Sequence, residues 1–196
     1  MLNTLSDRSS ALHPHNLTDG ELLLIGRLIR ACAEIDEIAN LYVTQLTGVE
    51  EFQSLLIYGR MATSTRLQIA ERFAKLKGES ALKLHKECFA NDEYENIIKI
   101  RNTVAHGNLL GKTDDGSIAF EMQQTTGHEE NRFFTTVNAY SSEAFEGLTD
   151  IAVAAVDQLL DRLDLRAARD AHRKKALSPH PNHRPKRHIG AEASVA

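Results

Sequence analysis

The four prolines of this 196-residue chain lie near its two ends, and none occurs between Pro14 and Pro179. Proline removes a backbone donor and clashes with the preceding helical turn, so a proline-free interval can hold long uninterrupted helices. Within this interval, apolar patterns stop at Gly48, Gly78 and Gly107, and glycine is typical of helix ends. The sequence therefore predicts a series of helices separated by glycine stops.

A capping box at Thr18 opens the longest predicted helix. Glu21 follows three positions later, a spacing that lets each side chain bond the backbone N–H of the other residue. The apolar positions that follow are Leu22, Ile25, Leu28, Ile29, Cys32, Ile35, Ile38, Ala39, Tyr42, Val43 and Leu46. Their spacing of three and four predicts one amphipathic helix that ends at Gly48.

Four further helices are predicted between Gly48 and Gly107. Apolar periodicity places the first three over residues 52–58, 64–77 and 80–90. Asn91 is a suitable N-cap for the fourth, because its side chain can accept a bond from a first-turn amide. The fourth helix is expected to end at Gly107.

The middle of the chain is different in character. Residues 117–122 and 133–137 are rich in strand formers, and Thr126–Glu129 lies between them as a turn, which predicts a β-hairpin. An isolated hairpin is marginally stable, so it must pack on the helices or on a partner. Ser141 or Ser142 then caps a final helix, which is expected to fray near residue 175.

These patterns predict an all-α dominated fold, an up-and-down helical bundle with a small β-hairpin inserted before the last helix. The length suits one domain, over residues 18–176. Residues 1–17 are expected to form an N-terminal tail. Residues 177–196 are rich in proline, histidine and arginine without an apolar period, and are expected to be disordered.

Composition excludes several classes of protein. A formal net charge of −4 argues against a protein that binds nucleic acid over an extended basic surface, although it allows a small basic cleft. The two cysteines, Cys32 and Cys88, lie in helical patterns without paired spacing, so we expect buried free thiols rather than a disulfide framework or a zinc site. No signal peptide or apolar span is recognisable, so a cytoplasmic protein without a membrane partner is the expectation. No cofactor or metal is expected.

The end of the fourth of these helices carries unusual polar residues. On a helical wheel, Tyr94, Ile97, Ile100 and Val104 form an apolar stripe, and Arg101 falls inside it. A charge among core positions needs a partner or an interface, because an unpaired buried charge is costly. The acidic cluster Glu34, Asp36 and Glu37 on the first helix is one possible partner.

His106 ends this helix directly before Gly107. The helix dipole favours a charged imidazolium there, which makes His106 a candidate general acid or base. Asn102 lies one turn earlier, whereas Arg101 and His106 are about 140° apart on the wheel. The two can meet only if the arginine side chain bends around or a second chain contributes. The alternative is structural, with Arg101 in an ion pair and His106 as a helix cap.

The segment Ile100-Arg101-Asn102-x-x-Ala105-His106-Gly107 resembles the signature of the HEPN superfamily, an arginine followed after four to six residues by a histidine. A polar residue directly after the arginine is common in that motif, and Asn102 fits this place. The layout of residues 55–70 is also similar to HEPN-like proteins, including the mannitol operon repressor family. The resemblance covers residues 18–165 as a helical fold and about eight residues as a motif.

The resemblance implies a metal-independent endoribonuclease, in some relatives a toxin or defence component, that acts as a homodimer on RNA. It implies catalytic roles for Arg101, Asn102 and His106: His106 would transfer a proton, Arg101 would bind the phosphate with its planar fork, and Asn102 would orient the histidine or the phosphate. An antitoxin or regulatory protein is a further possible partner. Many HEPN-like proteins are not nucleases, so a non-catalytic regulatory or protein-interaction module is the alternative.

Two other motifs are given less weight. Gly111-Lys112-Thr113 lacks the preceding strand and following helix of a P-loop and is interpreted as a turn into the hairpin. The histidines and basic residues of 180–188 can in principle bind metal or phosphate, but a disordered basic tail is the preferred interpretation.

Overall fold

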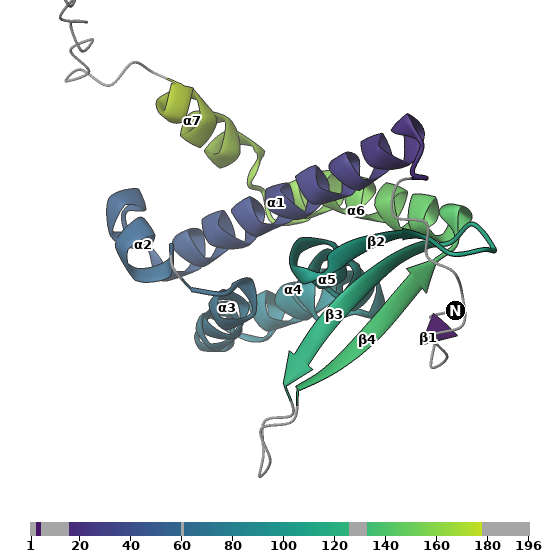
Figure 1. The fold of residues 1–196 in the computed structure, drawn as a ribbon. Coiled ribbons are helices and arrows are strands. Elements are labelled where there is room, and N and C mark those ends of the chain that lie inside the picture. The colour runs from purple at the N-terminus through teal and green to yellow at the C-terminus, as the bar shows by residue number, and fades with distance from the viewer. Residues whose placement is uncertain (1–2, 5–15, 60, 126–132, 178–196) are drawn as a thin grey trace, which may run out of the picture.

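A computed structural model describes residues 3–4, 16–59, 61–125 and 133–177 (Figure 1). These residues form a mainly helical fold with strands inserted before the last two helices, which confirms the predicted fold class. The predicted turn at 126–129, the tail after Leu177 and most of the N-terminal tail lie outside the described residues. The helices before the insertion are α1 (Asp19–Thr47), α2 (Glu51–Tyr58), α3 (Thr63–Lys77), α4 (Glu79–Phe89) and α5 (Asp92–His106).

The long helix α1 is the central support of the fold. Its capping box is formed as predicted: the Thr18 amide donates to Glu21 Oε2 at 2.8 Å, and the Glu21 amide donates to Thr18 Oγ1 at 3.3 Å. Gly48 ends the helix in the left-handed conformation, with φ at 67°. Figure 1 shows α1 crossing the bundle with α6 alongside it. Its inner face, including Leu28 and Ile38, is buried in the core, and helices α3, α5 and α6 pack against α1.

The predicted hairpin is present and belongs to a larger antiparallel sheet. Strands β3 (Ile118–Thr125) and β4 (Phe133–Tyr140) pair as expected, and the strand order is β1-β4-β3-β2. Strand β2 (Asn108–Lys112) was not predicted, and the interpretation of Gly111 and Lys112 as part of a turn is wrong, because both lie in this strand. Its burial pattern does not alternate, and its register shifts between Leu109 and Gly111. The two-residue strand β1 (Asn3–Thr4) also lies in the segment predicted as a tail.

The predicted single final helix is wrong, because the chain turns at Asp164. Helix α6 (Ser142–Arg162) ends there and α7 (Arg166–Leu177) begins in a new direction. Leu163 and Leu165 are both buried, at 4% and 1% exposure. Residues two apart on a helix point to nearly opposite sides, so a continuous helix could not bury both. Asp164 makes the turn in the left-handed region, with φ at 53°.

Helix α7 is held to α1 by ion pairs. Arg169 is only 8% exposed and donates to Glu34, and Arg173 Nη2 lies 3.0 Å from Glu37 Oε2. Burial raises the pKa of Glu34, but hydrogen bonds from Arg169 and Arg30 outweigh this, and its pKa is lowered overall. Two of the three acidic residues on this turn of α1 therefore serve the docking of α7.

We expect Glu34→Gln to destabilise the fold at neutral pH by about 1–2 kcal/mol, because it removes charged bonds to the nearly buried Arg169. A lowered folded-state pKa gives stability that is present above the ordinary value of 4.5 and lost as pH falls through the folded-state value. The difference in unfolding free energy between wild type and variant should therefore shrink as pH falls toward about 3. Urea titrations across pH measure it, with the exposed Glu50→Gln as control. A difference that does not depend on pH would contradict the assignment.

Gly107 ends α5 as predicted, but not by a left-handed turn. Its φ of −84° and ψ of 150° are open to any residue. The need for glycine comes from space: a Cβ here would clash with the Thr103 carbonyl oxygen and lie 3.1 Å from Met122 Sδ and 3.2 Å from the Glu121 carbonyl oxygen. The absence of a side chain lets strand β3 approach the end of α5.

We expect Gly107→Ala to lower the unfolding free energy by about 1–3 kcal/mol, because the new methyl group clashes with the Thr103 carbonyl oxygen at the end of α5 and crowds β3. Chemical denaturation measures the change. Gly26→Ala is the matched control, since a Cβ at Gly26 in α1 meets nothing within 4 Å. An effect at Gly107 no larger than at Gly26 would show that this close approach does not constrain the fold.

Candidate functional site at the end of helix α5

The three residues predicted as a site lie together at the end of α5. Arg101 Nη1 lies 3.1 Å from Asn102 Oδ1 and 3.3 Å from His106 Nε2. His106 is exposed, while Arg101 and Asn102 are partly buried. Arg101 reaches His106 within one chain, because the arginine side chain bends around the helix. No second chain is needed for this contact.

Arg101 also has the ionic partner that its place in the apolar stripe requires. Its Nη2 donates to Asp36 Oδ2 on α1 at 3.1 Å. The two side chains are 30% and 23% exposed, so the pair is only partly open to solvent. Partial burial strengthens the interaction relative to a fully exposed pair. The ion pair thus fixes one edge of the guanidinium and leaves the other edge beside His106.

The polar contacts continue from Asp36 to helix α3, which the sequence did not indicate. Asp36 Oδ1 accepts a hydrogen bond from Thr63 Oγ1 at 2.6 Å. Thr63 Oγ1 accepts in turn from Arg66 Nη2 at 3.0 Å. Asp36 and Thr63 are 27 positions apart in sequence, so no local pattern could signal the contact. A continuous chain of contacts therefore joins His106, Arg101, Asp36, Thr63 and Arg66.

Two buried groups, Cys32 and Tyr94, adjoin this chain of contacts. Burial raises the pKa of the Cys32 thiol to about 11, with a further rise from the Asp36 carboxylate and a partial opposing effect of Arg101. Burial also raises the pKa of Tyr94, with Asp36 acting in the same direction. Both groups are therefore protonated at neutral pH, and neither is an activated nucleophile.

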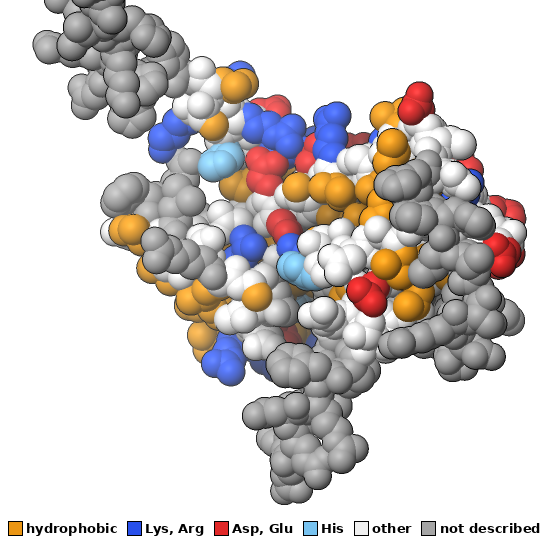
Figure 2. All heavy atoms as spheres, viewed as in Figure 1, with side chains coloured by type: hydrophobic (Ala, Val, Ile, Leu, Met, Phe, Trp, Pro, Cys, Tyr) orange, Lys and Arg blue, Asp and Glu red, His pale blue; other side chains and the backbone are white. Residues whose placement is uncertain are grey.

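A groove between α1 and α5 leads to Arg101. It encloses about 140 Å³. Its lining is mostly apolar and consists of Leu28, Ile29, Cys32, Ala33, Asp36, Arg101, Val104 and Ala105. Figure 2 shows hydrophobic side chains exposed over α1 on this face, with charged and histidine side chains beside them. The polar site therefore lies at the edge of an exposed apolar surface.

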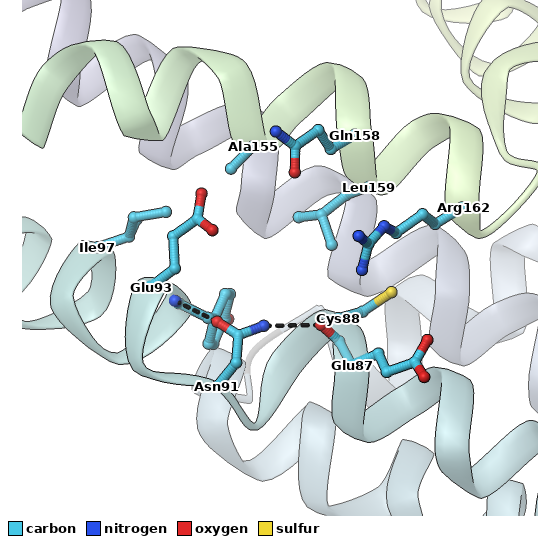
Figure 3. Close-up of a pocket in the computed structure, with 10 residues that line it drawn as sticks. Glu87, Cys88, Asn91, Glu93, Ile97, Ala155, Gln158, Leu159 and Arg162 are labelled. Atoms are coloured by element: carbon cyan, nitrogen blue, oxygen red, sulfur yellow. Dashed lines mark hydrogen bonds between the residues drawn. The ribbon is translucent and has the colours of Figure 1, made fainter.

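A second hollow lies among α4, α5 and α6 (Figure 3). It encloses only about 60 Å³, too little for a nucleotide. Asn91 caps α5 there by accepting from the Tyr94 amide at 2.8 Å, as predicted, and donates to the Glu87 carbonyl oxygen at 2.7 Å. Burial raises the pKa of the Cys88 thiol, and Arg162 opposes this in part. We assign this hollow to the packing of the helix ends.

The arrangement at α5 suits phosphate chemistry. A guanidinium can bind a phosphate through paired N–H groups, and an adjacent exposed imidazole can give or take a proton. Among the described residues, no group of three or more histidine, cysteine, aspartate or glutamate side chains is placed to hold a metal ion. No described helix combines the length and apolar character needed to cross a bilayer.

Comparisons with known proteins add no relative. No family model matches the chain, and neither a curated protein nor a solved structure matches it.

We expect a double-mutant cycle with Asp36→Asn and Arg101→Gln to give a coupling energy of about 1 kcal/mol in unfolding free energy. The charges lie 3.1 Å apart and are only partly open to solvent, which limits screening. Urea denaturation of the two single variants and the double variant measures the coupling. The exposed pair Glu95 and Lys99, 3.9 Å apart, is the comparison cycle and should couple less. Equal or vanishing coupling at Asp36 and Arg101 would contradict the role given to this ion pair.

Proposed function

We propose that the protein is a metal-independent endoribonuclease of the HEPN type, working in the cytoplasm as a homodimer, as a toxin or defence component. The observation that carries the proposal is the contact between Arg101 and His106, with Asn102 on the same guanidinium nitrogen. The contact supports the proposal, because a guanidinium can bind a phosphate and an imidazole can transfer a proton. The motif that carries the resemblance thus forms one cluster on an exposed edge of the fold.

The proposed reaction is attack of a ribose 2′-oxygen on the adjacent phosphorus. The new P–O bond forms as the bond to the 5′-oxygen of the next nucleotide breaks, which gives a 2′,3′-cyclic phosphate and a free 5′-hydroxyl. A base must take the proton of the 2′-hydroxyl, and an acid must protonate the leaving 5′-oxygen. Arg101 would stabilise the negative charge that builds on the phosphate. His106 would serve as base or acid, and Asn102 would hold the guanidinium in place.

A homodimer would supply the second proton-transfer group, because each motif contains one histidine. Exposed apolar side chains near the site support such an interface. Leu22 and Ile29, seven positions apart on one face of α1, are both 50% exposed, and Ile29 lines the groove that leads to Arg101. Large exposed apolar side chains that cluster on one face are typical of interaction surfaces. Two such faces brought together would place two motifs across one cleft.

One observation favours the alternative of a non-catalytic regulatory or interaction module. Arg101 already has an ionic partner, Asp36, in its own chain, and an arginine held in this way can simply join α1 to α5. An incoming phosphate would then have to compete with the carboxylate for the guanidinium. Only the Nη1 edge, which faces His106, is turned away from Asp36.

The proposal is tested by incubating the purified protein with single-stranded RNA in the presence of EDTA. We expect cleavage that falls at least about 100-fold in His106→Ala and in Arg101→Ala, because each variant removes a group that acts in the transition state. Asn102→Ala should cause a smaller loss, because Asn102 acts through Arg101. Light scattering should show a dimer that Ile29→Glu weakens.

His172→Ala is the matched control, because it removes a histidine from α7 rather than from the site at α5. Its cleavage rate should equal that of the wild type. A stable dimer without cleavage, or cleavage that survives in His106→Ala, would reject the nuclease and favour the interaction module.

A further inference from the structure

Helix α3 begins at the Asp36 side of the site, and its first turn carries no negative charge. Its N-cap is Ala62, which provides no side-chain hydrogen bond, and the first turn contains no acidic residue. The turn instead carries three hydroxyl groups and then Arg66, in the order Thr63-Ser64-Thr65-Arg66. The N-terminus of a helix is partly positive, so a cation there is unfavourable unless an anion offsets it.

The positive charge around Asp36 exceeds the negative charge. Asp36 accepts from Arg101 through one oxygen and from Thr63 through the other, and Arg66 bonds to the same threonine hydroxyl. The two neighbouring acids on α1, Glu34 and Glu37, are bonded to arginines of α7. Among the described contacts, Asp36 therefore bonds the Arg101 guanidinium directly and reaches the Arg66 guanidinium only through the Thr63 hydroxyl.

Two buried donors in this region have no hydrogen-bond acceptor among the residues that the structure describes. Arg66 Nε and the hydroxyl of Tyr94 are both buried without a partner, and Tyr94 as a whole is only 7% exposed. The charges of Asp36, Arg66 and Arg101 all act on the Tyr94 hydroxyl, so it is buried within range of the same group of charges. Buried N–H and O–H groups are almost always bonded in folded proteins. Excess positive charge together with unpaired donors indicates a place for an anionic oxygen ligand.

We propose that Arg66, Thr63 and the first turn of α3, with the Tyr94 hydroxyl behind them, form a phosphate-binding subsite adjacent to Arg101. Helix N-termini and guanidinium groups both bind phosphate oxygens. If the protein is the ribonuclease proposed above, the natural occupant is a backbone phosphate next to the one that is cleaved. The subsite then fixes how the RNA lies across the end of α5.

The first test uses inorganic phosphate as the probe and does not depend on cleavage. Phosphate should raise the thermal unfolding midpoint of the full-length protein above that in chloride at equal ionic strength. Arg66→Gln should weaken the apparent phosphate affinity about tenfold or more, because it removes a charge-assisted donor. Arg72→Gln removes the same charge from the exposed side of the same helix and should leave the affinity unchanged.

Ser64→Asp separates phosphate binding from structural support. Ser64 is exposed in the first turn of α3, where an acidic residue favours the helix dipole. The variant should unfold at the same or a higher temperature than wild type without phosphate, yet lose the stabilisation by phosphate. Equal phosphate affinity in wild type, Arg66→Gln and Ser64→Asp, or no effect of phosphate on the wild type, would overturn the subsite.

The second test uses RNA as the ligand and shows whether the bound phosphate belongs to an RNA backbone. In cleavage assays, Arg66→Gln should raise KM about tenfold or more and change kcat little, because the bound phosphate is not the reacting one. His106-dependent cleavage with the same KM in wild type and Arg66→Gln would reject the subsite and leave the nuclease intact. Phosphate binding that needs Arg66, without any cleavage of RNA, would reject the nuclease and leave an anion site for a free phosphate compound.

Discussion

The ion pair between Arg101 and Asp36 is the interaction on which the candidate site depends. An arginine placed among the apolar positions of α5 would be costly without a partner, and a carboxylate on α1 meets this need at 3.1 Å. The pair joins the two helices that carry much of the core. It also sets the direction of the guanidinium, with one edge on Asp36 and the other beside His106. A structural requirement and a possible chemical function therefore meet in one side chain.

The three acidic residues on one turn of α1 contact different parts of the molecule. Glu34 and Glu37 hold α7, whereas Asp36 faces α5 and the start of α3. The position of α7 and the arrangement of the site are thus set within a few residues of one another. A change in this turn of α1 would be felt both in the stability of the fold and in the site.

Local signals in the sequence were sufficient to predict most helices. The capping box at Thr18, the N-cap at Asn91 and the helix end at Gly107 depend on neighbouring residues, and all three were found as predicted. The wheel also showed that Arg101 needed a partner, and Asp36 was among the candidates. The sequence alone does not determine whether Arg101 contacts His106, because a helical wheel gives the directions of side chains but not the reach of a long, flexible one.

The features that sequence reasoning missed depend on contacts far apart in the chain. Strand β2 is identified by its pairing with β3 rather than by its own pattern. The break at Asp164 follows from the burial of both Leu163 and Leu165, which a continuing apolar pattern conceals. Thr63 and Arg66 join the site only because α3 packs against α1. The need for glycine at position 107 arises from the space taken by the Thr103 carbonyl oxygen of α5 and by β3, not from its φ angle.

The most direct test of the central claim is the chemical identity of the ends that the protein leaves on a defined RNA. Mass spectrometry of the products distinguishes the two possible attacking groups. If Arg101 binds the phosphate while His106 transfers a proton from the 2′-hydroxyl, the products carry a 2′,3′-cyclic phosphate and a 5′-hydroxyl. Products with a 3′-hydroxyl and a 5′-phosphate would mean that water is the attacking group, and would contradict the account.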